Sequence, residues 1–521
     1  MNKARLVNKL RNGRKRTALI AVGVAALPFA VSACSSSTQA GGGSTLGIVM
    51  GAEPASLDPC DSVYEATGTV LNQNVTEPII LRNPNTGKMS PEIATSWKAS
   101  DDDKQWTLTI KSGLKFSNGA PVTATDVAAS ITRIFKSSLA CGNTQEFSEG
   151  TLTTDVVSPT KLVVNSPKPD PILPIRLSFV QVGPASQMNS GTKLRNPIGS
   201  GPYKVKTWQA GQQITLVPNK LYSGTTKAAF QDVEYQWRSE TSVAAAMIKT
   251  DEADIALNIT PLDNTGNHSV TFPTQQVLFL GLEGGVAPLN NFDVRKAIYY
   301  AIDMKGLAAA MFHGAAQPAT QLVPPGAVGY NPDLKPLGYS PAKAKALIAA
   351  AKAQGANLSA PITIFSQAGF VPGVTDGIEV IAQEMRSIGL NVQTKLVQRP
   401  QILDQLGPKP NDGVTTALLW IHGNSGGDAS FTSASWWGSG GSNTLFGTPE
   451  EQAKIDYAEA QSGAARQKAF ANAAAYSYEH VLGELPLLRL DATIGVSPDV
   501  KFSPTADSIN ELPLSEVSWA K

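Results

Sequence analysis

A short glycine-rich stretch carries the residue types of a covalent catalyst. Residues 423–427 read Gly-Asn-Ser-Gly-Gly, match the pattern G-x-S-x-G and follow an apolar stretch predicted as a strand. In serine hydrolases this pattern places a nucleophilic serine on a strand–turn–helix elbow, served by a histidine base and an oxyanion segment. Here the next residues, 428–441, are rich in serine and glycine and do not predict a helix. His480 is the only histidine downstream, and no HGGG-type segment is present. A hydrolase acting through Ser425 is therefore the alternative, and a protein that is not an enzyme is expected.

The histidines and cysteines do not form a metal-binding pattern. The sequence contains no H-E-x-x-H and no C-x-x-C motif, which are the spacings that bring ligands to one metal ion. It also has no Walker A motif, the pattern of a loop that binds nucleotide phosphates. We expect no resident cofactor and no metal site. The four histidines lie far apart in the chain, at His268, His313, His422 and His480.

The first 33 residues have the layout of an export signal. Seven basic residues and no acidic residue precede an apolar stretch at 17–33. This stretch is shorter than the ~20 apolar residues of a membrane-spanning helix. A basic start, a short apolar core and small residues at its end are typical of a secretory signal peptide. An uncleaved anchor helix is the alternative, and Pro28 and the small residues at 32–33 count against it.

The end of this signal, Val31-Ser32-Ala33-Cys34, resembles a bacterial lipobox. In such signals the cysteine is acylated through its sulfur and becomes the new N-terminus. Residues 35–44 contain mainly Ser, Thr, Gln and Gly, a composition typical of a flexible linker. The sequence thus predicts a signal peptide at 1–33 and a lipidated tether at 34–44. The lipid at Cys34 would anchor the exported protein to the outer face of the bacterial cell membrane, in the cell envelope or periplasm.

The rest of the chain is mildly acidic and has two cysteines. Removal of residues 1–33 leaves 36 basic and 42 acidic residues, so no basic patch of nucleic-acid-binding size is expected. Nucleic acid is therefore not an expected partner, and we expect a monomer. Outside the cell an even pair of cysteines usually bonds. This predicts a disulfide between Cys60 and Cys141, with two separate buried thiols as the alternative.

Hydrophobic periodicity predicts a mixed α/β protein. Strands are expected at 45–51, 161–167, 212–219 and 414–421, with a hairpin at 105–119. Amphipathic helices are expected at 123–137, 293–312, 340–355 and in the first part of 375–397, which continues into a strand. Helices alternate with strands through the second half, which is the α/β pattern, and the part after the tether is richer in strands.

Five segments, spread in order over nearly the whole chain after the tether, resemble the signatures of one family. They are SLDPC at 56–60, FSNGAPVTATDVAASITRI at 116–134, NPIGSGPYKVKTWQAGQQITLVPNKLYSG at 196–224, FDVRKAIYYAIDMKGL at 292–307 and IAQEMRSIGLNVQ at 381–393. The family is the extracellular solute-binding proteins of family 5, the oligopeptide, dipeptide and nickel class that serves ABC importers. Physically these motifs are scaffold. Gly199 and Gly201 flank a turn that a side chain would crowd, and Arg295 is expected to join its helix to the neighbouring elements.

The resemblance implies a two-lobed, periplasmic-binding-protein-like α/β fold of type II, in the three-part cluster C class. Such lobes close on a ligand in the cleft between them by hinge motion. We expect a discontinuous lobe 1, an inserted β-rich subdomain, a lobe 2, and a hinge at the two crossings between the lobes. The expected bounds are 45–65, 187–283 and 487–521 for lobe 1, 66–186 for the inserted subdomain and 284–486 for lobe 2.

The function implied by the resemblance is capture of an extracellular solute and its delivery to an ABC permease with its ATPase. A peptide is the leading ligand, and a metal chelate, a glycan or an opine-like compound is the alternative. In peptide-binding relatives a strand ends in Trp, and an Asp three residues on pairs with the α-amino group of the ligand. Here the strand is expected to end at Trp420, but position 423 is Gly. Either Asp428 replaces this amine clamp or the clamp is absent.

Other ligand-contacting residues are predicted around the same cleft. Glu53 precedes the SLDP motif by three residues, where peptide-binding relatives carry an acid at the cleft mouth. Trp420 offers an apolar wall, with core packing as its alternative. For the pair Trp436-Trp437 the favoured arrangement is one ring in the core and one on the surface. The remaining candidates are Tyr64, Trp237, Arg238, His422 and Trp437.

Overall fold

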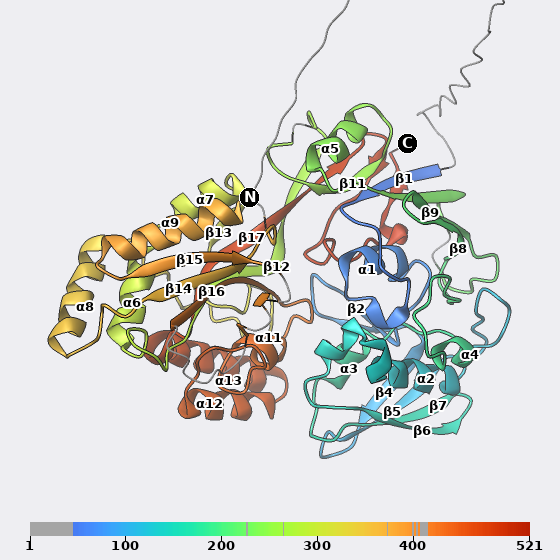
Figure 1. The fold of residues 1–521 in the computed structure, drawn as a ribbon. Coiled ribbons are helices and arrows are strands. Elements are labelled where there is room, and N and C mark those ends of the chain that lie inside the picture. Colours follow the sequence, from blue (N-terminus) through green and yellow to red (C-terminus); the bar gives the residue numbers. More distant parts are fainter. Residues whose placement is uncertain are drawn as a thin grey trace, which may run out of the picture. The chain divides into compact units, whose positions relative to one another are not determined.

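One large mixed sheet organises the chain. The structure is a computed structural model that describes residues 45–520 except 226–227, 264, 372, 399–400, 403–404 and 407–414. The predicted signal peptide, the tether and Cys34 lie outside the described residues. The strand order is β15-β14-β16-β12-β17-β11-β1-β10-β9-β8, with β13 paired to β17 (Figure 1). The strands are β1 (Thr45–Met50), β8 (Tyr203–Gln209), β9 (Gln213–Pro218), β10 (Asp232–Trp237), β11 (Ile255–Ile259), β12 (Ser269–Leu282), β13 (Ala316–Pro318), β14 (Ile362–Gln367), β15 (Val392–Val397), β16 (Thr415–Gly423) and β17 (Glu484–Val496).

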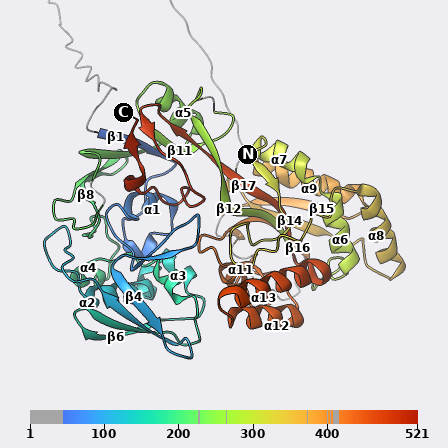
Figure 2. The same ribbon diagram turned by 180° about the vertical axis from the view of Figure 1, so that it is seen from behind.

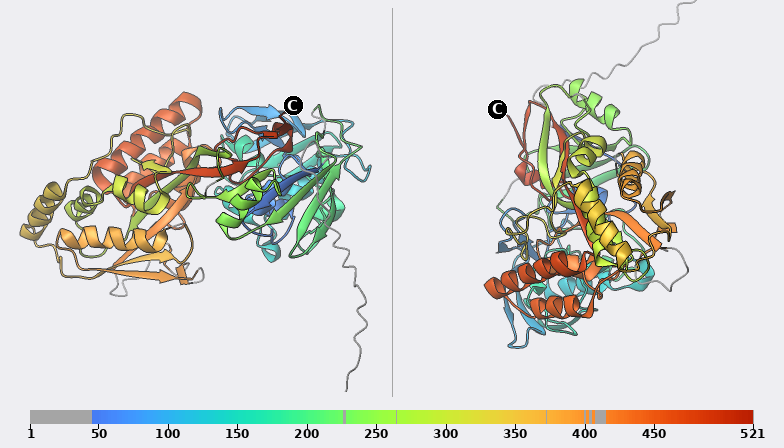
Figure 3. Two further views of the ribbon diagram at one scale, coloured as in Figure 1. Left: turned by 90° about the horizontal axis from the view of Figure 1, so that it is seen from above. Right: turned by 90° about the vertical axis from the view of Figure 1, so that its left-hand side faces the viewer.

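Two long strands carry the sheet from one group of strands to the other. β12 and β17 pair with each other antiparallel from Ser269 to Gly281. β12 also pairs with β16, and the far end of β17 pairs with β11. In the sheet of the described residues, β12 and β17 thus lie between the parallel strands β14–β16 and the group of β1 and β8–β11. β17 is the long red strand in the left view of Figure 3. The expected α/β fold is confirmed.

Alternating residues of β12 and β16 face two different helical layers, as the period of two in a strand requires. Leu278, Leu280 and Leu419 share a core with one set of helices. Phe279 and Trp420 pack with Trp436 on the other side. The first set is α6 (Phe292–Ala301), α7 (Met304–Phe312), α8 (Pro341–Ala353) and α9 (Val374–Ser387); the second side carries α11 (Ala429–Trp436), with α12 (Pro449–Glu459) and α13 (Gly463–Tyr476) (Figure 2).

The predicted inserted subdomain has a sheet of its own, in the order β4-β5-β7-β6. The hairpin expected at 105–119 is wrong, because β5 pairs with β4 and β7, and only an isolated bridge joins Lys115 to Pro121. Its elements, with the neighbouring short ones, are α1 (Glu65–Leu71), β2 (Ile80–Arg82), β3 (Met89–Pro91), β4 (Ala94–Ala99), β5 (Gln105–Ile110), α2 (Ala124–Ile134), β6 (Thr153–Ser158), β7 (Lys161–Asn165), α3 (Leu173–Leu177) and α4 (Ala185–Met188); α5 (Thr241–Lys249) precedes β11.

Helix ends follow their capping residues. Thr123 and Asp126 form a capping box at the start of α2, and Ser340 caps α8. The single helix expected at 293–312 is wrong: Ile302 leaves the helical conformation, and Asp303 accepts a hydrogen bond from the Lys305 amide to start α7. Among the described residues, no helix combines the length and apolarity needed to cross a membrane.

Candidate functional site

Two of the sequence signatures meet at a buried ion pair. Asp58 of SLDPC accepts a hydrogen bond of 2.9 Å from Nε of Arg133, which lies near the end of α2. Nη1 of the same arginine donates to the carbonyls of Met188 and Ser190, at 2.8 and 2.9 Å. Burial acts to raise the pKa of Asp58, but hydrogen bonds from Arg133 and from backbone amides hold this pKa below its ordinary value. The pair fixes the SLDPC loop against α2.

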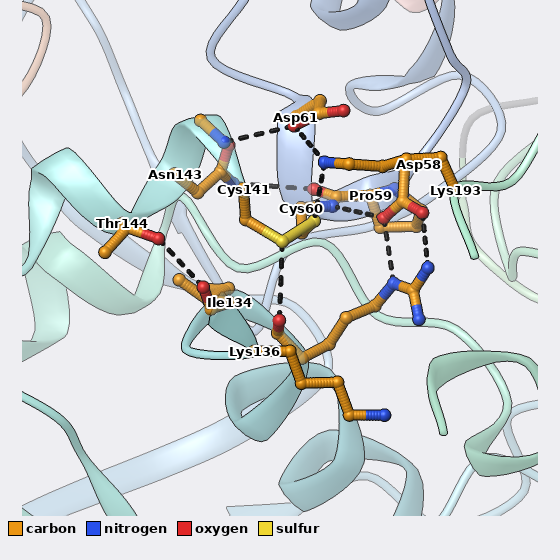
Figure 4. The surroundings of a disulfide bond; sticks show 12 residues. Asp58, Pro59, Cys60, Asp61, Ile134, Lys136, Cys141, Asn143, Thr144 and Lys193 are labelled. Carbon is orange, nitrogen blue, oxygen red and sulfur yellow. Dashed lines mark hydrogen bonds and ion pairs between the residues drawn. A yellow bond between two sulfur atoms is a disulfide. The ribbon is translucent and has the colours of Figure 1, made fainter. Parts of the chain in front are cut away.

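The predicted disulfide between Cys60 and Cys141 is confirmed (Figure 4). It joins the SLDPC loop to the segment that follows α2, across 81 residues of sequence. Beside it, Nζ of Lys193 lies 2.6 Å from Oδ1 of Asp61 and 3.4 Å from Sγ of Cys60. The loop is thus held by a covalent bond and by ion pairs, and residues that follow it, Ser62, Val63 and Glu65, line the cavities described below.

The remaining signatures are scaffold, as expected. A Cβ at Gly199 would lie 1.9 Å from the carbonyl oxygen of Val75, and one at Gly201 would lie 2.4 Å from that of Asn74. Only glycine permits this approach of two backbones. The buried Arg295 joins α6 to two other segments, because it donates hydrogen bonds to the carbonyls of Val481 and Leu289.

A cavity of about 490 Å³ lies beside the two connecting strands. Its walls come from both predicted lobes: Leu257 and Ile509 belong to lobe 1, and Phe370 and Ile421 belong to lobe 2. Apolar walls with a few polar groups are typical of sites for small organic ligands. Burial raises the pKa of Glu65 at the start of α1. The polar groups of this main cavity include Glu65, Gln276, His313, Asp491 and Asn510.

A second, smaller cavity adjoins the first at Asn510, which lines both. Its volume is about 70 Å³, and Arg82, Ser425, Asp507 and Glu511 line it. Burial raises the pKa of Asp507 to about 6, against the opposing charge of Arg82. Burial and the neighbouring carboxylates raise the pKa of Glu511 to about 8. Polar and charged side chains form a larger share of the walls of this cavity than of the main one.

Two predicted ligand residues of β16 lie behind the cavity wall. Trp420 is only 8% exposed, and its ring stacks at 4.1 Å on Phe370, which does line the main cavity. The expectation that the strand ends at Trp420 is wrong, since β16 continues to Gly423. His422 is buried, and its Nε2 lies 2.9 Å from Oγ1 of Thr432. Burial lowers the pKa of His422 to about 4.

Asp428 forms a buried ion pair with Arg466 of α13. Nε and Nη2 of the arginine donate to the two carboxylate oxygens, at 2.8 and 2.7 Å. Oδ1 of Asp428 also accepts from the Ser430 amide and so caps α11. The expectation that no helix follows the GNSGG residues is therefore wrong: an aspartate cap and a buried face make a helix of the Ser/Gly-rich segment.

The hydrolase alternative needs a base at Ser425. His422 is bonded to Thr432, and His480 lies in a turn of π-helix at Ser477–Val481, where Nε2 is 3.8 Å from the Glu479 carboxylate. Among the hydrogen bonds of the described residues, none joins Ser425 to a histidine. Its carbonyl instead accepts from Arg82.

The other predicted ligand residues have protein partners. Oε1 and Oε2 of Glu53 accept from Trp208 Nε1 and from the Gly211 amide, at 2.8 and 3.0 Å. Trp237 ends β10, and Arg238 donates to the Trp237 carbonyl and to Gln236 Oε1.

Tyr64 and Trp437 complete the set of predicted residues. Tyr64 is 52% exposed and lies between two residues that line the cavities. Trp436 and Trp437 are both buried, so the expected surface ring is wrong; Trp437 donates to Glu451 and Ser477. Within the described part of the chain, none of the eight candidates lines either of the two cavities. Ile421 belongs to the predicted strand, whereas no sequence signal marked Phe370, Arg82 or Asn510.

The fold and the cavity between two groups of strands define a two-lobed solute-binding protein. The family model of the bacterial extracellular solute-binding proteins, family 5, middle part, matches residues 88–444. The chain therefore belongs to this family. The described residues contain no group of His, Cys, Asp and Glu that could hold a metal ion.

Known relatives agree with this assignment. The chain is 29% identical over 317 residues to the probable D,D-dipeptide-binding periplasmic protein DdpA of Escherichia coli, a match that covers 57% of this chain and 60% of that protein. In structure it is similar to the periplasmic binding protein DppA of Helicobacter pylori in complex with peptide STSA, with a TM-score of 0.75, 21% identity and coverage of 92% and 98%. It is also similar to NikA of Brucella suis in complex with Fe(III)-EDTA, with a TM-score of 0.77, 22% identity and coverage of 91% and 99%.

Proposed function

We propose that this protein captures an extracellular peptide in the main cavity and delivers it to an ABC permease driven by a partner ATPase. The observation that carries the proposal is the cavity of about 490 Å³ with walls from both predicted lobes. A ligand there contacts both lobes at once, so its binding energy favours the state in which the lobes are together. The similarity to a D,D-dipeptide-binding protein and to a complex with a peptide supports this ligand class.

β12 and β17 are the natural hinge of this movement. They join the strands β14–β16 to β1 and β8–β11, and the predicted crossings near residues 283 and 486 lie at their ends. A small change of twist in two strands moves one lobe against the other without breaking either core. The lipid at Cys34 and the tether at 34–44 would keep the monomer at the outer face of the membrane, near its permease.

A non-peptide solute is the second candidate. Position 423 is Gly, and both carboxylate oxygens of Asp428 are bonded to Arg466. Neither position offers a free carboxylate to the α-amino group of a peptide. A metal chelate, a glycan or an opine-like compound needs no such clamp, and one similar structure holds Fe(III)-EDTA.

Native mass spectrometry of the protein purified from its own host tests both candidates. A mixture of bound peptides supports peptide capture, and a single non-peptide mass supports the second candidate. Ile421→Asp places a charge in the apolar wall and should abolish retention of the cargo. Val157→Asp, on an exposed position of β6, is the matched control. Retention by Ile421→Asp equal to the control would contradict the proposed site. Separately, Cys34→Ala should release the protein from membranes.

A further inference from the structure

The loop Gly423–Gly427 has a role that catalysis does not explain. We propose that Arg82 and this loop form a latch between the lobes, which stabilises the state in which the lobes are together. The latch is defined by Arg82, Ser425, Gly427 and Asp507. The inference rests on the proposed function, because a latch matters only if the lobes open and close.

Arg82 contacts both predicted lobes. It ends β2 in the inserted subdomain, and its Nη1 lies 3.1 Å from the carbonyl oxygen of Ser425 in lobe 2. The same Nη1 lies 3.3 Å from Oδ2 of Asp507, in the last segment of lobe 1. The ion pair between Arg82 and Asp507 joins the inserted subdomain to lobe 1. Both lie on the same side of the cavities, so the pair remains when lobe 2 moves away. The carboxylate of Asp507 thus keeps the guanidinium of Arg82 directed at the carbonyl of Ser425.

Gly427 lies close to the guanidinium of Arg82. Its φ is +65°, in the left-handed region that favours glycine. A Cβ at this position would lie 2.0 Å from Nη2 of Arg82. A larger residue would therefore push the end of the arginine side chain away from its place at the loop. Contact between the lobes thus accounts for Gly427 and for the bonded carbonyl of Ser425 in this G-x-S-x-G pattern.

A second contact lies a few residues further along the same segment. The ring of Phe431 in α11 is 5.8 Å from the ring of Phe179, edge to face, and 5.2 Å from the guanidinium of Arg176. Phe179 and Arg176 both belong to the inserted subdomain. Phe431 is only 7% exposed. Residues 425–431 therefore meet the subdomain at two places, and the ion pair of Asp428 with Arg466 holds the start of α11 between them.

The latch acts on any ligand in the same way. A charged donor on a carbonyl oxygen is a strong hydrogen bond when it is shielded from water. Because the bond to Ser425 exists only when the lobes meet, it shifts the equilibrium between open and closed states before a ligand binds. Loss of the bond should lower the affinity for every cargo by a common factor of about ten.

Hydrogen–deuterium exchange of the full-length protein, freed of cargo, tests the latch without a ligand. In Arg82→Ala the amides of residues 424–431 should exchange about tenfold faster. Arg386→Ala is the matched control: this arginine lies on α9 in a half-exposed ion pair with Glu379 and should leave these amides unchanged. Equal exchange in the two variants would overturn the proposal. If Arg82→Ala does not fold, Arg82→Lys keeps the charge and should give a smaller effect in the same direction.

Two glycine-to-alanine variants separate the steric clash with Arg82 from the backbone strain of a positive φ. Gly427→Ala should reproduce the faster exchange of Arg82→Ala. Gly87 has a similar positive φ, +67°, but no atom lies within 4 Å of a Cβ at its position. Gly87→Ala should therefore leave the exchange of residues 424–431 unchanged. Failure of wild-type protein to retain peptides would overturn the peptide function and leave this result intact. Normal retention with unchanged exchange in Gly427→Ala would overturn the latch and leave the function intact.

Discussion

Two of the buried aspartate–arginine pairs of the described residues have nearly the same geometry, but only one of them stands in a sequence signature. Asp58 pairs with Arg133, and Asp428 pairs with Arg466; the Nε–oxygen distances are 2.9 and 2.8 Å. Each arginine also donates to backbone carbonyls of a neighbouring segment. In both places the fork of a guanidinium fixes a loop before or beside a helix.

The two pairs differ in how far the role of each aspartate could be predicted from the sequence. Asp58 stands in the SLDPC signature, and its structural role agrees with the interpretation of the signatures as scaffold. Asp428 stands near Trp420 in a glycine-rich loop and was a candidate for the amine clamp. A carboxylate alone does not show its partner, because Arg133 lies 75 residues from its aspartate and Arg466 lies 38 residues from its own.

Arg133→Ala should give the largest loss of stability. It leaves the carboxylate of Asp58 buried without its cation, and several carbonyls without their donor. Removing one partner of a buried ion pair costs about 3–5 kcal/mol. The free energy of unfolding in guanidinium chloride measures the effect. Arg386→Ala, in a half-exposed pair, should change this energy by less than about 1 kcal/mol. Similar losses in both variants would mean that the buried pair adds no special stability.

Asp428→Asn tests whether the carboxylate of Asp428 stabilises the fold or binds the ligand. The variant keeps the shape of the side chain but removes the charge that Arg466 needs, so unfolding should become easier by about 2–3 kcal/mol. Retention of cargo in native mass spectrometry should not change, because the carboxylate does not line the cavities.

The control for this variant is Asp232→Asn, in an exposed pair with Lys206. It should affect stability by at most about 1 kcal/mol. Loss of peptide cargo from Asp428→Asn, with stability like that of the control, would identify Asp428 as the amine clamp after all.

Local signals predicted much of the fold. The starts of α2 and α8 and the strand β16 were expected from the sequence, because residues close together in the chain set them: Thr123 and Asp126, Ser340, and the apolar stretch of β16. Gly199 and Gly201 were recognised because they stand in the signature that begins NPIGSGPY. The helix α11 was missed because its sequence has low helix propensity; burial of Phe431 and Trp436 and the Asp428 cap override that propensity.

The cavities were not predictable in the same way. Leu257, Phe370, Ile421 and Ile509 are neighbours only because β12 and β17 bring four distant segments together. No one of them differs in type from a core residue. The ligand candidates chosen from sequence were aromatic or charged, and such side chains also contact other parts of the protein, as Trp420 does with Phe370 and Glu53 with Trp208.

His422 should make the second pair sensitive to acid in a way that the first is not. Its ring bonds to Thr432, which also accepts from Asn424, and Asn424 donates to the carbonyl of Asp428. Burial lowers the pKa of His422 to about 4, below the ordinary value of about 6.5. Between these values the unfolded chain binds a proton that the folded protein does not. The contribution of His422 to stability is therefore present above pH ~6.5 and is lost as the pH falls toward ~4.

His422→Gln keeps a hydrogen-bonding group near Thr432 and removes this titration. The difference in unfolding free energy between wild type and variant should thus shrink by about 2 kcal/mol from pH 7.5 to pH 5. The difference between the two proteins is used because Glu77 and Glu511 titrate in both and their contributions cancel. Burial raises the pKa values of these two glutamates to about 8, so their effect on stability with pH is opposite to that of His422. Arg386→Ala, in a half-exposed ion pair, should show no such change relative to wild type over the same range. A pH-independent difference for His422→Gln would mean that the imidazole can take up a proton in the folded state, and that the network around Asp428 opens to water.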